Sequence, residues 1–160
     1  MAFDCVLDAS AFYAGTPFLS GRKCLTTGAV FDEIRHVKSA ALEALMDAGN
    51  FSVLDPDRKD VDAVTAAAKK TGDIARLSQA DISVIALALQ KNATLVSDDY
   101  AVANVAATLG ISVEMSSGKG IKQVRKWVSY CSACGKAYGP DAKECRLCGN
   151  KLKRRYKVTG

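Results

Sequence analysis

The chain has 160 residues, of which 49% are hydrophobic, 24% are charged and 3 are proline. This length allows one full-sized hydrophobic core with a small additional unit, and the composition excludes a disordered or fibrous protein. The N-terminus has no basic segment followed by an apolar run, and no stretch approaches the roughly 20 apolar residues of a membrane helix. We therefore expect a cytoplasmic protein that does not contact a membrane.

The net charge of +5 is distributed unevenly along the chain. From Lys119 onward there are 12 lysines and arginines against two acids, whereas the first 118 residues contain 10 basic and 15 acidic side chains. This pattern indicates a basic tail that meets a polyanion such as RNA and an acidic body that holds cations. Lysines that only increase solubility would produce the same tail, so this alternative stays open.

Short apolar runs alternate with helical patterns along the first 115 residues. We expect strands within 3–7, 51–57, 93–99 and, more weakly, 110–115, and helices within 30–49, 61–72, 77–92 and 100–110. Strands that alternate with helices favour right-handed crossovers and a parallel sheet with helices on its faces. The sequence therefore predicts an α/β domain with a parallel sheet flanked by helices.

Carboxylates follow two of the expected strands. Asp8 follows the first strand, and the pair Asp98 and Asp99 follows the third, so they share the carboxyl edge of a parallel sheet. Glu33 lies on the helix after the first strand, and Asp81 lies in the first turn of the helix before the third. Because no lysine or arginine stands at matching positions, these acids would repel one another without a hard cation such as Mg²⁺ or Mn²⁺. We interpret the five acids as a candidate catalytic site.

Each acid also has a structural interpretation. Ser78 and Asp81 have the spacing of an ordinary capping box, Asp8 or Asp98 could cap the helix that follows, and Glu33 could be a solvated helix position. Helix caps have no reason to converge on one edge of a sheet, so their convergence favours a metal site.

The segment SSGKG at 116–120 marks the change from acidic to basic composition. We expect a domain that carries the five acids at 1–118, a linker or connecting strand at 119–127, and a C-terminal unit at 128–160. The alternating segment VRKWVSY at 124–130 predicts a strand that leads into a cysteine motif.

Four of the six cysteines form the pattern C-x2-C-x10-C-x2-C. They are Cys131, Cys134, Cys145 and Cys148. Two such turns present four thiolates in a tetrahedron, which predicts a structural zinc ribbon with no open position for a substrate. Gly135 and Gly149 follow the second cysteine of each pair, where a positive φ is often required. A redox dithiol or a pair of disulfides is the alternative.

Basic side chains around this motif are candidate RNA contacts, because they can neutralise phosphates while neighbouring aromatic rings stack on bases. They are Arg125, Lys126, Lys151, Lys153, Arg154, Arg155 and Lys157. For Trp127, packing of the ribbon against the body is the favoured interpretation.

The acidic motifs resemble those of a known family in order and spacing. VLDASAF with Asp8, TTGAVFDEI with Glu33, LSQADISVIALAL with Asp81 and TLVSDDYAVANVA with Asp98 and Asp99 resemble the motifs of PIN-domain ribonucleases over residues 1 to about 115. The zinc ribbon and the segment SDDYAVANVA resemble those of the Nin-one-binding protein family, whose members trim the 3′ end of small-subunit ribosomal RNA precursors. The short chain is similar to archaeal members.

The resemblance implies a metal-dependent endoribonuclease that acts on single-stranded precursor rRNA, with assembly factors as possible further partners. Asp8, Asp81 and the pair Asp98 and Asp99 would hold Mg²⁺ or Mn²⁺, and Glu33 would bind a second ion or orient the water. Which acid of the pair binds, and whether one or two ions act, stays open at this point.

Two other functions are consistent with the sequence. One is a non-catalytic RNA-binding factor of ribosome assembly, in which the acids are structural. The other is a toxin-like PIN ribonuclease, although such toxins usually lack a ribbon. We interpret His36, the only histidine, as structural, and Ser10 as a residue that orients Asp8. Ser97 stands where the family often has threonine and keeps the hydroxyl group.

Overall fold

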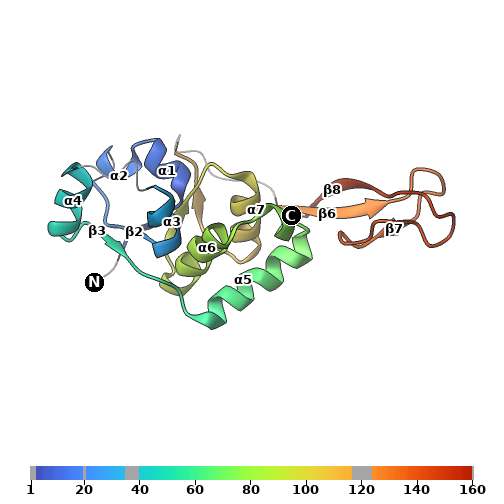
Figure 1. Ribbon diagram of the computed structural model, residues 1–160, viewed down its shortest axis with the longest axis horizontal. Helices are drawn as coiled ribbons and strands as arrows, with labels where there is room; N and C mark the ends of the chain where they lie inside the picture. Colours follow the sequence, from blue (N-terminus) through green and yellow to red (C-terminus); the bar gives the residue numbers. More distant parts are fainter. Residues whose placement is uncertain (1–2, 20, 35–39, 117–123, 160) are drawn as a thin grey trace.

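The computed structural model describes residues 3–19, 21–34, 40–116 and 124–159, and its strands form two sheets (Figure 1). The strands are β1 (Cys5–Leu7), β2 (Cys24–Thr26), β3 (Phe51–Val53), β4 (Thr94–Val96), β5 (Val113–Glu114), β6 (Val124–Tyr130), β7 (Ala137–Tyr138) and β8 (Lys153–Thr159). The helices are α1 (Ala9–Tyr13), α2 (Thr16–Leu19), α3 (Gly28–Glu33), α4 (Ala40–Asp47), α5 (Arg58–Thr71), the 3-10 helix η2 (Ile74–Arg76), α6 (Gln79–Lys91) and α7 (Tyr100–Thr108).

The larger sheet is parallel throughout and has the order β3-β2-β1-β4-β5. The chain builds outward from β1 to β3 on one side and then crosses back to place β4 and β5 on the other side. The strand order therefore reverses between β1 and β4, which are aligned with Leu7 opposite Val96. In open α/β sheets this reversal point, at the carboxyl ends of the strands, is where ligands bind.

The core of this domain lies between the sheet and its helices. All three residues of β1 are fully buried, and so are the central residues of α6. Phe12 of α1 meets Phe51 of β3 edge to face, with ring centroids 5.6 Å apart. The α/β fold with a parallel sheet flanked by helices is confirmed. None of the helices in the described ranges is long and apolar enough to span a bilayer.

The smaller sheet is antiparallel and has the order β7-β6-β8. Strands β6 and β8 pair along seven positions, from Val124 opposite Thr159 to Tyr130 opposite Lys153. They leave the body beside α5 and α7 and lead out to the cysteine-bearing loops (Figure 1). The basic tail is thus a strand and not a free extension, which the sequence did not indicate.

Several elements differ from the expectations. Strand β2 and helices α1 and α2 were not predicted, because three to five residues are too short to show a period. The helix expected within 30–49 is present as α3 and α4, and residues 35–39 between them, including His36, lie outside the described part of the chain. The domain boundary expected after residue 118 also lies outside the described residues, and β6 continues past position 127.

Candidate functional site

Asp8 lies at the reversal point of the sheet and is only 5% exposed. It caps helix α1, where the N–H of Ala9 donates to its Oδ1 at 2.7 Å, and the Ser97 hydroxyl donates to its Oδ2 at 2.7 Å. Burial raises the pKa of the Asp8 carboxyl, and the nearby charges of Asp81 and Asp99 raise it further, while the two hydrogen bonds lower it. Two acids from distant parts of the sequence therefore act on Asp8 at this edge.

Asp81 and Asp99 lie at the N-terminal ends of α6 and α7. The Oδ2 of Asp81 accepts the N–H of Ser78 at 2.8 Å in a capping box, as the structural interpretation predicted. The Oδ1 of Asp99 accepts two N–H groups from the first turn of α7, including that of Ala101 at 2.8 Å. Among the described residues, each carboxylate makes these bonds through one oxygen, so its second oxygen is available to a cation.

Asp98 is oriented differently from its neighbour Asp99. Its Oδ1 accepts the N–H of Ser116 at 2.8 Å, and its Oδ2 accepts the Ser116 hydroxyl at 2.6 Å. Both of its oxygens are therefore bound to the segment that follows β5. The structure thus distinguishes the two adjacent acids: Asp99 acts on the pKa of Asp8, and Asp98 binds the segment that follows β5.

Two serines fix the backbone and side chains of the site. The Ser97 hydroxyl is fully buried and links two acids, because it donates to Asp8 and accepts the N–H of Asp99 at 3.1 Å. Ser10, which we expected to orient Asp8, accepts the N–H of Asp98 at 3.0 Å instead. The prediction for Ser10 was therefore wrong. The position of Ser97, directly after a buried strand and before two acids, is the signal that could have identified it.

Glu33 is the last residue of α3 and is exposed. Helix α3 is attached to α6 by the hydroxyl groups of Thr27 and Ser83, which lie 2.7 Å apart. Within the described ranges, no hydrogen bond or ion pair joins Glu33 to the other acids, so its role stays a prediction.

The chemistry of Asp8, Asp81 and Asp99 fits a hard divalent cation. Their negative charges have no lysine or arginine partner among the described residues, and carboxylate oxygens are the ligands that Mg²⁺ and Mn²⁺ prefer. Within the described ranges, the cysteine cluster described next is the only group of three or more histidine, cysteine or acidic side chains whose ligand atoms are already close enough together to hold a metal ion.

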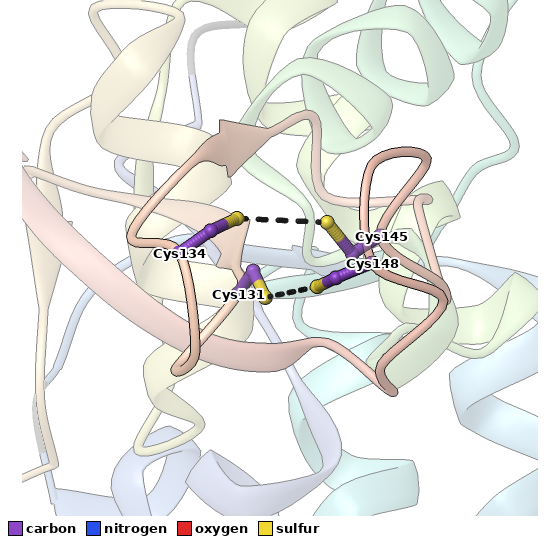
Figure 2. Close-up of side chains that lie close together, drawn as sticks. All are labelled: Cys131, Cys134, Cys145 and Cys148. Atoms are coloured by element: carbon purple, nitrogen blue, oxygen red, sulfur yellow. Dashed lines mark hydrogen bonds between the residues drawn. The ribbon is translucent and has the colours of Figure 1, made fainter.

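The four cysteines of the C-terminal unit face one another across two loops (Figure 2). The Sγ atoms of Cys131 and Cys148 are 3.3 Å apart, those of Cys134 and Cys145 are 3.7 Å apart, and all four lie within 4.8 Å. A tetrahedral zinc ion with four thiolates requires sulfur separations of about 3.8 Å, so this cluster fits zinc. The glycines that follow each pair have φ values of 76° and 72°, as predicted.

Tyr138 supports this cluster from the outside. Its hydroxyl lies 3.2 Å from Sγ of Cys145 and accepts the N–H of Arg146 at 3.1 Å. The hydrogen bond from Tyr138, followed by backbone N–H groups of Cys148 and Leu147, lowers the pKa of Cys145 to about 6, which favours the thiolate that a metal requires. Tyr138 thus has a structural contact that the sequence did not predict.

The basic residues predicted to bind RNA have different surroundings. Lys151 and Lys153 are exposed, and the guanidinium of Arg155 lies 5.0 Å from the ring centroid of Tyr130. Arg154 donates to the carbonyl of Gly72 at 2.7 Å, so it is engaged with the body. The side chains of three others lie outside the described part of the chain, although their backbones belong to β6 and β8. They are Arg125, Lys126 and Lys157.

The class of protein follows from a comparison with known families. The family described as the PIN domain of ribonuclease matches residues 5–90, which carry three of the five acids. The fold, the buried acid at the reversal point and this match define the N-terminal part of the chain as a PIN domain. The resemblance noted from the acidic motifs is confirmed.

Individual relatives narrow this class. The chain is 39% identical to Endoribonuclease Nob1 of Methanocaldococcus jannaschii, covering 94% of this chain and 76% of the relative. It is also 39% identical to Endoribonuclease Nob1 of Pyrococcus abyssi, with 92% and 91% coverage. Ribonuclease VapC1 of Thermoplasma acidophilum is 35% identical, with 94% and 77% coverage. The chain belongs to the Nob1 endoribonuclease family.

Proposed function

We propose that this chain is a metal-dependent endoribonuclease that hydrolyses a phosphodiester in single-stranded precursor rRNA, at the 3′ end of the small-subunit rRNA. The observation that carries this proposal is the buried carboxylate of Asp8, whose pKa is raised by burial and by two further acids without a basic partner. Such an uncompensated cluster is costly unless it binds a cation. Membership in an endoribonuclease family supports the same reaction. A cytoplasmic location, where ribosomal subunits mature, is part of this proposal.

We assign Asp8, Asp81 and Asp99 as ligands of Mg²⁺ or Mn²⁺. Asp99 is preferred over Asp98 because both oxygens of Asp98 are bound to Ser116. A bound divalent ion supplies an activated water and stabilises the charge that develops on the phosphate. Ser97 holds the Asp8 carboxylate in place, and Glu33 is assigned to orient the water or to bind a second ion.

The C-terminal unit has a separate task in this proposal. We infer that Zn²⁺ occupies the cysteine cluster and that the basic side chains around it bind precursor rRNA of the small subunit. The chain would then consist of a PIN nuclease domain at 1–118, a linker or connecting strand at 119–127 and an RNA-binding zinc ribbon at 128–160. Assembly factors would be further partners.

The alternative functions have weaker support. A non-catalytic assembly factor would have no need for mutually repelling acids at the reversal point of the sheet. A toxin-like PIN ribonuclease is suggested by the name of one relative, VapC1. The similarity to that relative extends over 94% of this chain, however, so it is not limited to a PIN domain.

The function can be tested with an RNA that spans the 3′ end of small-subunit rRNA and its downstream extension. With Mn²⁺ or Mg²⁺, we expect a single cut that leaves the mature 3′ end, and with EDTA we expect no cut, since the acids require a cation to act. Absence of cleavage with either ion, while a gel shift shows that the RNA is bound, would favour the assembly factor.

The contribution of the ribbon charges can be measured through the salt dependence of RNA binding. Deletion of the tail is unsuitable, because β8 pairs with β6 along seven positions. Replacing Lys151 and Lys153 with glutamine should instead reduce the slope of log affinity against log salt by about 1.4, the value for two phosphate contacts on a single strand. Lys59→Gln, at the exposed start of α5, is the matched control and should leave the slope unchanged. An unchanged slope in the double variant would mean that these lysines do not contact phosphates.

A further inference from the structure

A buried carboxylate outside the acidic edge, which is the edge of the larger sheet that carries Asp8, Asp81 and Asp99, joins the two parts of the molecule. Asp73 follows Gly72, the residue that caps the end of α5, and is 2% exposed. Its Oδ1 accepts the indole N–H of Trp127 at 2.9 Å, and its Oδ2 accepts the side-chain amide of Asn104 at 2.7 Å. Both oxygens of this acid are therefore used, each by a different element of the fold.

The two hydrogen-bond partners of Asp73 connect the ribbon to the acidic edge. Trp127 belongs to β6 of the smaller sheet, and the buried Asn104 belongs to α7. Helix α7 begins at its cap Asp99, one of the proposed metal ligands. Since a helix rises about 1.5 Å per residue, the contact at Asn104 lies only about 7.5 Å along the axis from that acid.

The packing around this contact leaves little room for movement. Gly72 has a φ of 84°, and a Cβ there would lie 2.6 Å from Cβ of Trp127 and 2.8 Å from Cβ of Pro140. The guanidinium groups of Arg76 and Arg154 lie 4.9 and 5.1 Å from the ring centroid of Trp127. Figure 1 shows β6 and β8 leaving the body at this point, beside α5 and α7. The expectation that Trp127 packs the ribbon against the body is confirmed.

We propose that Asp73 is a positioning residue that holds the ribbon in one orientation to the acidic edge, so that the bond to be cut is selected by its distance from ribbon-bound RNA. The part of this proposal that concerns RNA cleavage rests on the proposed function. A loosely tethered ribbon would present a range of phosphates to the acids, whereas a fixed one presents a single phosphate. Selection by distance requires no recognition of the bases at the cut.

The test compares Asp73→Asn with the intact protein. An asparagine is uncharged and accepts at only one atom, so it replaces two charge-assisted hydrogen bonds with one neutral bond, and its amide must face the indole N–H of Trp127 or an Asn104 side chain that has turned its oxygen inward. Trp127 is the only tryptophan in the chain, so its emission reports on this contact without RNA. We expect a red-shifted emission that acrylamide quenches more strongly. Asp62→Asn, on the exposed face of α5, is the control and should leave the emission unchanged.

Two RNAs provide the functional readout. On a short unstructured strand, Asp73→Asn should cut at the wild-type rate within about twofold, because the acids are intact. On the structured precursor, we expect cuts at several neighbouring bonds and a kcat/KM lower by about tenfold to 100-fold. Trp127→Phe, which removes only the indole N–H group and one ring, should give the same spread of cuts, and this second variant guards against a folding defect in the first.

The proposal is overturned if Asp73→Asn keeps the wild-type emission and a single cut, or if it slows the cutting of both RNAs equally. Failure of the intact protein to cut either RNA would instead count against the proposed function. The two failures are distinguishable, because the emission of Trp127 tests the contact in the absence of RNA.

Discussion

Replacing Asp8 with asparagine is expected to slow RNA cleavage by on the order of 10³-fold, the scale seen when a group that stabilises transition-state charge is removed. The reason is the loss of a charged ligand in a site whose other contacts survive. The asparagine oxygen can still accept the N–H of Ala9, and the Ser97 hydroxyl can turn to accept from the new amide. Single-turnover rates with Mn²⁺ would measure the effect on the chemical step.

The matched control is Asp47→Asn, which removes an exposed carboxylate at the end of α4. It should cut RNA at the wild-type rate. A cleavage rate for Asp8→Asn that is equal to that of Asp47→Asn would exclude Asp8 from the reaction.

Replacing Asp8 with asparagine should also change how the free energy of unfolding depends on pH in the metal-free protein. Burial raises the pKa of Asp8 in the folded state above the ordinary aspartate value of 3.8, so folding favours the protonated form. The stabilisation from this proton is complete below the unfolded pKa and is lost as the pH rises through the folded pKa. Asp8→Asn should therefore become progressively more stable than the wild type as the pH rises above 3.8, as urea unfolding in EDTA would show.

Removal of zinc is expected to unfold the loops that carry the four cysteines while the PIN domain remains folded. Metal binding in small zinc domains contributes about 10–16 kcal/mol, and these loops have no comparable core of their own. The PIN domain has its own buried core between the sheet and helices. After treatment with a strong chelator, trypsin should cut after Lys136, Lys143 and Arg146, and mass spectrometry would locate the cuts.

The remaining cysteines provide an internal control for this experiment. Cys5 and Cys24 lie in neighbouring strands of the PIN domain and are 0% and 1% exposed. A thiol reagent should therefore label four cysteines after chelation and leave these two unlabelled. Labelling of none or of all six would contradict a structural zinc ion that folds the ribbon alone.

Much of the site could be predicted because its residues have local sequence signatures. Asp8 and Asp99 each follow a short apolar run, and the cysteines have a spacing that only a few structures require. The choice between Asp98 and Asp99 could not be predicted, because both acids precede the first helical residue of α7 and the partner of Asp98, Ser116, lies 18 residues away.

Other residues had no local signature at all. Asp73 is a single acid after a glycine that ends a helix, and its importance depends on Asn104 and Trp127, which are 31 and 54 residues away. The three-residue strand β2 forms because β1 and β3 pair with it on both sides, and not because of its own sequence pattern.

The placement of Asp81 and Asp99 at helix starts has a consequence for the metal-free protein. The N-terminal ends of α6 and α7 carry the partial positive charge of the helix macrodipole, and both ends meet the acids at this edge. This positive field offsets part of the repulsion among the carboxylates before any ion arrives. If these acids hold the proposed ion, we expect the sheet edge to stay folded when the ion leaves, so that nuclease activity would follow the free concentration of the ion.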